Sequence, residues 1–140
     1  MALTVVFDTN ILFSATGWRG NPFQCVERAR AGEVNAVTCP ELIQELGEKL
    51  DIKLKFSPGQ TTETLADYLS FHRVVNIPKT LDAVPRDAED NAVLECALEG
   101  GASHVVTGDD DLLVLKAFRG IQIVRATEFL KILAERKRSE

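Results

Sequence analysis

Short apolar runs, rich in β-branched residues, alternate with longer stretches of helical periodicity along the whole chain. The runs that predict strands are 3–7, 34–38, 74–77, 104–107 and 121–125. The stretches that predict helices are 23–31, 41–52, 61–72, 87–99, 109–118 and 127–137. The Gly, Pro and Ser residues at 17–22 and 57–59 predict a loop and a turn. Apolar strands that alternate with helices are typical of a parallel sheet covered on both faces, so we predict an α/β fold, a three-layer α/β/α sandwich with a five-stranded parallel sheet.

The size and composition suit an ordinary globular protein. A length of 140 residues without a linker-like segment predicts a single domain over 1–140. No apolar run reaches the roughly 18–20 residues that span a bilayer, and the first residues lack the basic segment of a signal peptide. The three cysteines have no CxxC spacing, which argues against a disulfide framework or a zinc site. We therefore expect a reduced, cytoplasmic protein with no membrane partner.

The acidic residues are unevenly distributed, although the net charge is only −5. Six of the 21 acids form two short blocks, in 87–90 and 109–111, and the remaining 15 acids nearly balance 16 bases. The chain therefore lacks the strongly basic character that is usual for a nucleic-acid binder. Ligands of parallel sheets bind at the carboxyl ends of the strands, and both blocks lie at or near such ends. This concentration of acids suggests a bound cation.

Two acids outside the blocks are candidates for the same site. Asp8 directly follows the first apolar run, where a buried carboxylate needs a partner or a metal ion. Asp is also a good N-cap, so the alternative is that Asp8 caps a helix beginning near Thr9. In the stretch 41–52, a rotation of about 100° per residue places Glu45 nearest the apolar stripe and turns the neighbouring glutamates towards solvent. The alternative for Glu45 is a position on the same solvated helix face as Glu41 and Glu48.

Helix capping is the alternative explanation for the two acidic blocks. Asp87 as an N-cap, with Asp90 in the first turn, would satisfy free N–H groups and suit the helix dipole. Asp109 would cap the next helix in the same way. One acid suffices as a cap, however, and three adjacent carboxylates repel one another unless solvent or a cation screens them. Capping also leaves unexplained why a second acidic block follows the next strand.

Other enzyme classes find little support in the sequence. The chain has no G-x-S-x-G, G-x-G-x-x-G or Walker A motif, which argues against a serine hydrolase, a dinucleotide enzyme and a P-loop enzyme. His72 and His104 lack ligand spacing, so structural roles are expected for both. A phosphatase of the haloacid dehalogenase type needs a second Asp two residues after its nucleophilic Asp, and here Asn10 occupies that position.

Three segments share motifs with one family. They are 5–12 (Val-Val-Phe-Asp-Thr-Asn-Ile-Leu), 87–91 (Asp-Ala-Glu-Asp-Asn) and 105–113 (Val-Val-Thr-Gly-Asp-Asp-Asp-Leu-Leu). In this order they resemble the PIN-domain nucleases, and most of all the toxin branch of bacterial and archaeal toxin–antitoxin systems, related to VapC. The resemblance covers nearly the whole chain. It implies a parallel α/β sandwich in which a ring of acids binds Mg²⁺ or Mn²⁺ and cuts RNA.

By position, the resemblance implies which residues form that ring. The catalytic acids would be Asp8, Glu45, Asp90 and Asp109. The metal ligands among them would be Asp8, Asp90 and Asp109, with support from Asn10, Asp87, Thr107 and Asp111. An acidic pocket repels RNA, so basic side chains should rim it, and the candidates are Arg19, Arg86 and Lys116.

We therefore predict a Mg²⁺- or Mn²⁺-dependent endoribonuclease for single-stranded RNA, acting as the toxin of a toxin–antitoxin pair. The alternative is a PIN fold that mainly binds RNA or protein, with little or no cleavage. The resemblance also implies a homodimer and a cognate antitoxin protein as partners. Trp18 and Phe23, which border the predicted loop, are candidates for an apolar dimer patch.

Overall fold

The structure is a computed structural model that describes residues 2–84 and 88–139. Its strands are β1 (Thr4–Phe7), β2 (Asn35–Thr38), β3 (His72–Val74), β4 (His104–Val106), β5 (Ala117–Phe118) and β6 (Ile121–Val124). Its helices are α1 (Thr9–Gly17), α2 (Asn21–Arg30), α3 (Pro40–Lys53), α4 (Pro58–Leu69), α5 (Ala88–Gly100), α6 (Asp110–Leu113) and α7 (Ala126–Ser139). The six strands form one sheet in the order β3-β2-β1-β4-β6-β5, and only the β5–β6 pair is antiparallel.

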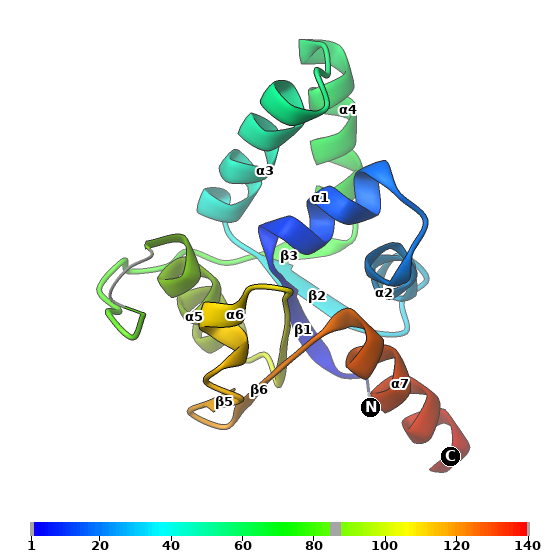
Figure 1. The fold of residues 1–140 in the computed structure, drawn as a ribbon, viewed down its shortest axis with the longest axis vertical. Coiled ribbons are helices and arrows are strands. Elements are labelled where there is room, and N and C mark those ends of the chain that lie inside the picture. Colours follow the sequence, from blue (N-terminus) through cyan, green and yellow to red (C-terminus); the bar gives the residue numbers. More distant parts are fainter. Residues whose placement is uncertain (1, 85–87, 140) are drawn as a thin grey trace.

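Two hydrophobic cores lie on opposite faces of this sheet. Successive side chains of a strand point to opposite faces, so Val5 packs with α1, α2 and α7, whereas Val6 packs with α5. Figure 1 shows α1, α2 and α7 on one side of the sheet and α5 and α6 on the other. Helix α3 reaches both cores, because Leu42 joins the α5 side and Leu46 joins the α1 side. The predicted α/β sandwich is confirmed, with six strands in place of five.

The sixth strand comes from a segment for which a helix was expected. The prediction of a helix over 109–118 is wrong beyond Leu113, because α6 has only four residues. The chain then forms a hairpin in which Arg119 and Gly120 have φ of 49° and 84°. Positive φ at both central residues is the geometry of a two-residue type I′ turn, which joins antiparallel strands such as β5 and β6. Arg is uncommon at the first of these positions, so the local sequence signal was weak.

Three further boundaries differ from the predictions. The predicted loop 17–22 is shorter, because α1 fills the chain up to Gly17 and α2 begins at Asn21. The predicted turn 57–59 is the start of α4, where Ser57 and Gln60 form a capping box. Ser, Pro and Gly also favour turns, and only the Gln at the third helical position distinguishes the two cases. Helix α4 ends earlier than predicted, so β3 begins at His72.

The histidines and cysteines lie inside the protein. Burial lowers the pKa of His72, and its Nδ1 lies 2.6 Å from the Tyr68 carbonyl oxygen. Burial likewise lowers the pKa of His104. All three cysteines are buried and free. Among the helices of the described residues, none combines the length and the apolar character that crossing a bilayer requires.

Candidate metal centre and active site

The carboxyl ends of β1 and β4 bring two polar segments together. These strands are parallel neighbours with Phe7 opposite Val106, so the residues that follow them, Asp8 and Thr107, lie side by side. The Asp8 N–H extends the strand pairing by donating to the Val106 carbonyl oxygen at 3.0 Å. The sheet itself therefore holds the backbone of Asp8 in place, and the side chain is buried.

Thr107 links two of the acids. Its Oγ1 donates a hydrogen bond to Asp8 Oδ2 at 2.6 Å and accepts one from the Asp109 N–H at 3.0 Å. The Thr107 side chain is fully buried, so its bond to Asp8 is shielded from water. One hydroxyl thus fixes the Asp8 carboxylate and the backbone at Asp109.

Helix capping by Asp8 and by Asp109 can be compared directly, and the outcomes differ. Asp8 occupies the N-cap position of α1, but its side chain makes no capping hydrogen bond. Asp109 does cap α6, because its Oδ1 accepts a hydrogen bond from the Asp111 N–H at 2.8 Å. Capping thus explains one oxygen of Asp109 and does not account for the carboxylate of Asp8.

Three carboxylates converge at this edge of the sheet. Asp90, Asp109 and Asp111 each offer an oxygen, and these oxygens lie within 4.8 Å of one another. Asp90 comes from the first turn of α5 and is only 4% exposed, whereas Asp111 lies at the surface on α6. Carboxylates this close repel one another unless a cation lies between them, and hard oxygen donors suit Mg²⁺ or Mn²⁺. The geometry therefore fits a divalent metal centre.

Asp8 lies beside this group of three acids. Burial raises the pKa of Asp8 above its ordinary value, and the negative charge of Asp109 raises it further. The hydrogen bond from Thr107 and the nearby backbone N–H of Asn10 offset part of that increase, and the Lys49 charge offsets a little more. Desolvation disfavours the ionised form of a carboxyl, and a cation at the centre would restore it.

Glu45 lies on α3, and its carboxylate forms an ion pair with a lysine of the same helix. The Lys49 ammonium lies 3.1 Å from Glu45 Oε1 and donates a hydrogen bond to Asn10 Oδ1 at 2.6 Å. Burial raises the pKa of Glu45 to about 7, and the ion pair with Lys49 opposes this rise. The charge of Glu89 adds to the increase. Asn10, which the resemblance placed next to the acids, thus contacts the site through Lys49.

Lys49 was missed by the sequence analysis. It lies one turn after Glu45 on the same side of α3, a spacing at which Glu and Lys often pair. That spacing was the available signal. Its contact with Asn10, 39 positions away, could come only from the packing of α1 on α3.

Two buried polar residues of α5 have a structural role. Asn91 accepts hydrogen bonds from the Ala83 and Val84 N–H groups and donates one to the Val84 carbonyl. Glu95, one turn on, accepts bonds from the N–H groups of Lys79 and Leu81. These bonds tie the segment before α5 to the helix and so position its first turn.

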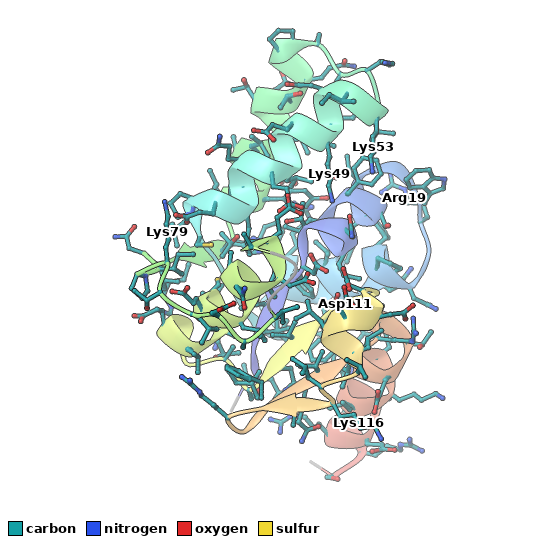
Figure 2. All side chains as sticks on the ribbon, turned by 60° about the vertical axis from the view of Figure 1, so that its left-hand side comes forward. Arg19, Lys49, Lys53, Lys79, Asp111 and Lys116 are labelled. Carbon is teal, nitrogen blue, oxygen red and sulfur yellow. The ribbon has the colours of Figure 1, made fainter. Side chains whose placement is uncertain are left out.

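The two described candidates for the basic rim, Arg19 and Lys116, lie in different parts of the molecule. Arg19 follows α1, and its guanidinium lies 4.4 Å from the Phe23 ring centroid. Lys116 lies well apart from Asp111, on the side of the molecule where β5 and α7 are found (Figure 2). The prediction that Lys116 borders the acids is therefore wrong, because the short α6 leads it away into the hairpin. Arg86 and Asp87 lie outside the described residues.

A cleft of about 430 Å³ runs between α3 and α5 beside these acids. Its lining includes Glu45 and Glu89, and at its other end Glu41, which forms an ion pair with Lys79 at 3.0 Å. Glu41 is therefore half-buried rather than on a solvated face, whereas Glu48 is exposed as predicted. Asp90, Asp109 and Asp111 are not part of the lining, so the metal centre lies beside the cleft rather than inside it.

The fold and the site define a class of protein, the mostly parallel α/β domains with a cluster of acids, suited to a divalent metal ion, at the carboxyl edge of the sheet. The family comparison is more specific. The PIN-domain model matches residues 4–111, which include β1, α3, α5 and the acids after β4, and the chain therefore belongs to the PIN-domain family. PIN-domain nucleases are metal-dependent hydrolases, in agreement with the carboxylate cluster.

A solved structure has the same fold. The crystal structure of PAE2754 from Pyrobaculum aerophilum matches with a TM-score of 0.63, covering 96% of this chain and 92% of that one at 22% identity. Comparison with curated proteins gives no significant match. At this level of identity the structural likeness extends to the fold, and the function is argued from the site.

Proposed function

We propose that this protein is a Mg²⁺- or Mn²⁺-dependent endoribonuclease that hydrolyses phosphodiester bonds in single-stranded RNA. The observation that carries the proposal is the convergence of Asp90, Asp109 and Asp111, whose oxygens lie within 4.8 Å of one another in a PIN-domain chain. Their mutual repulsion destabilises the metal-free protein, and a divalent cation would remove it. Three converging carboxylates fit a metal centre better than a set of helix caps, because one acid suffices as a cap.

The three carboxylates would hold the ion, and Asp8 would support them through Thr107. When bound, such an ion lowers the pKa of a coordinated water and neutralises charge that develops on the phosphate. Thr107 orients Asp8 Oδ2 and holds the Asp109 backbone, so one hydroxyl links the two acids. Preorganised groups of this kind need no rearrangement during the reaction.

Glu45 would accept the proton of the attacking water. A general base works best when its pKa is near the working pH, and the pKa of Glu45 is raised to about 7 by burial. Lys49 Nζ holds Oε1, so we assign proton transfer to the other carboxylate oxygen. We assign water attack at phosphorus with cleavage of the P–O3′ bond, in which the leaving 3′ oxygen takes a proton from solvent, so the products should carry 5′-phosphate and 3′-hydroxyl ends.

The test is cleavage of single-stranded RNA by the purified protein with Mn²⁺, followed by product-end analysis. EDTA should abolish cleavage, and Asp90→Asn should lower kcat/KM by about 10²–10³-fold. Asp110→Asn is the matched control, because Asp110 is adjacent to two of the acids, is 93% exposed and lies outside their cluster. Cleavage that survives EDTA, or a 2′,3′-cyclic phosphate product, would contradict this mechanism.

We propose further that the protein acts in the cytoplasm as the toxin of a toxin–antitoxin pair. The resemblance of its motifs to the VapC-related branch supports this role. Induced expression should arrest growth of a bacterial host, and Asp90→Asn should not. Co-expression of a small protein encoded next to the gene should relieve the arrest. Full growth during expression of the active enzyme would favour an RNA-processing role.

A further inference from the structure

A row of basic and aromatic side chains leads away from the acidic site. Lys49 and Lys53 follow Glu45 at intervals of four residues, so all three lie on one side of α3. The facing side of α1 carries Asn10 and Phe13, and these two helices pack against each other. Figure 2 shows Lys49 and Lys53 one after the other along α3, with Arg19 to one side of them.

The contacts in this row connect the two helices step by step. Lys49 donates to Asn10 Oδ1 at 2.6 Å, and one turn further the Lys53 ammonium lies 5.8 Å from the centroid of the Phe13 ring. The Phe13 and Trp18 rings are inclined at 55° with their centroids 6.0 Å apart. Two lysines of α3 thus face Asn10 and Phe13 of α1, and the ring pair continues to Trp18 at the end of α1.

The outer end of the row is exposed. Trp18 is 58% exposed, and Lys53 and Arg19 are exposed as well. Trp18 adds little to the hydrophobic core, since it belongs to neither core cluster among the described residues. A large ring that is held by a neighbouring ring but left open to solvent provides a surface on which another flat group can stack.

We propose that Lys49, Lys53, Phe13, Trp18 and Arg19 form a binding strip for single-stranded RNA that leads into the acidic site. Proteins that bind single strands combine cations for the phosphates with aromatic rings for the unpaired bases, and this strip offers both. A duplex hides its base faces and cannot use Trp18 in this way. The link to catalysis rests on the proposed function, whereas binding by the strip does not.

The strip also accounts for how RNA could approach a site that is itself acidic. A cluster of carboxylates repels a polyanion, and the chain as a whole carries a net charge of −5. Lys53 and Arg19 would attract the strand on the α1–α3 side. The RNA strand could then approach the acids from that side, with Lys49 at the boundary between the strip and the acids.

RNA suits the strip better than a second copy of this chain. A two-fold dimer places the same patch on both partners, so Lys53 and Arg19 would each face like charges or their own copies. Phosphates offer the opposite charge to the same groups. A dimer that buries Trp18 is therefore the competing outcome, and the experiment below includes it.

The experiment uses the fact that Trp18 is the only tryptophan of the chain. Its fluorescence should be quenched in a saturable way by a single-stranded 12-nucleotide RNA in EDTA, and far less by the same RNA in a duplex. With labelled RNA, anisotropy should show that Trp18→Ala weakens binding by about 10-fold, since stacking on one ring contributes roughly 1–3 kcal/mol. Trp18→Phe should retain most of the affinity because it keeps a ring.

Salt dependence separates the cations from the ring. Lys53→Met should lower the slope of log affinity against log salt by about 0.7, the value for one contact with a single strand, and Lys53→Arg should restore it. Lys131→Met, an exposed lysine on α7, should leave the slope unchanged. Equal affinity in wild type and Trp18→Ala would overturn the proposal. So would a wild-type dimer in sedimentation that Trp18→Ala dissociates.

The two proposals fail in different ways. If the strip binds RNA through Trp18 but no metal restores cleavage, the strip stands and the nuclease assignment fails. If the protein cleaves RNA and Trp18→Ala leaves both KM and affinity unchanged, the nuclease assignment stands and the strip is rejected.

Discussion

The acidic site has two walls that are built in different ways. At the strand ends, Asp8 and Asp109 are held by a neutral hydroxyl and by backbone amides. On α3, Glu45 is held by the ammonium group of Lys49. The strand wall therefore concentrates negative charge, whereas the helix wall brings its own positive charge. The same chemical group, a carboxylate, can thus need an external cation on one side of a site and none on the other.

Among the predictions about the two walls, the largest expected effect comes from removing the Thr107 hydroxyl of the strand wall. Thr107→Val keeps the shape of the side chain but removes the bridge between Asp8 and Asp109. We expect a loss in kcat/KM of about 10–100-fold, the range seen when groups that orient metal ligands are removed. The free energy of unfolding should fall by roughly 1–3 kcal/mol, because a buried carboxylate loses its donor.

Thr107→Ser is the control for this prediction, since it keeps the hydroxyl. It should retain most of the activity, measured as Mn²⁺-dependent cleavage, and most of the stability, measured by urea unfolding. If Thr107→Val were as active as wild type, the bridge would have no part in positioning the acids.

The next prediction removes the cation from the helix wall. In Lys49→Met, Glu45 loses the ion pair that opposes the rise of its pKa, so its carboxyl takes up a proton at neutral pH. The pH at which cleavage is half-maximal should therefore move upward, because Glu45 must be ionised to accept a proton. Lys131→Met is the matched control. An unchanged pH profile of kcat/KM in Lys49→Met would mean that Lys49 does not influence the pKa of Glu45.

Repulsion among the carboxylates predicts a smaller effect on stability. Asp111→Asn should raise the melting temperature of the metal-free protein by about 2–5 °C, because one of three clustered charges is removed. Asp109→Ala should lower it, because α6 loses its cap. With saturating Mn²⁺, wild type should have a higher melting temperature than Asp111→Asn. An Asp111→Asn protein that melts lower than wild type in EDTA would show that repulsion is unimportant.

The smallest effect concerns pH and the helix wall. The pKa of Glu45 is raised from 4.5 to about 7 in the folded protein, so its protonated form is favoured by folding. Its contribution to stability is fully present below pH 4.5 and is lost as the pH rises through about 7. Glu45→Gln should therefore match wild type in acid and become the more stable protein above pH 7.

Thermal melting over this pH range measures the difference. Glu48→Gln, on the exposed side of the same helix, should follow wild type at every pH. A constant difference between Glu45→Gln and wild type across the range would mean that the pKa of Glu45 is not raised.

Much of the fold could be predicted because its signals are local. The strands β1, β2, β4 and β6 lie in short segments rich in β-branched and apolar residues, and their alternation with helices dictates a parallel sheet covered on both faces. The errors fall where local signals are ambiguous. Ser57 and Pro58 suit both a turn and a helix start, and Lys116 and Arg119 adopt positive φ, which lysine and arginine seldom do.

By itself, the sequence determined that Asp8, Asp90 and Asp109 lie at one edge of the sheet, because the order of strands and helices is a one-dimensional pattern. Which side chains contact one another at that edge depends on how the elements pack in three dimensions. The hydroxyl of Thr107 reaches Asp8 across 99 positions and Lys49 reaches Asn10 across 39, and these contacts depend on strand register and helix packing. Side-chain partners at such separations are chosen by the arrangement of whole elements in space, so no spacing rule along the chain can identify them.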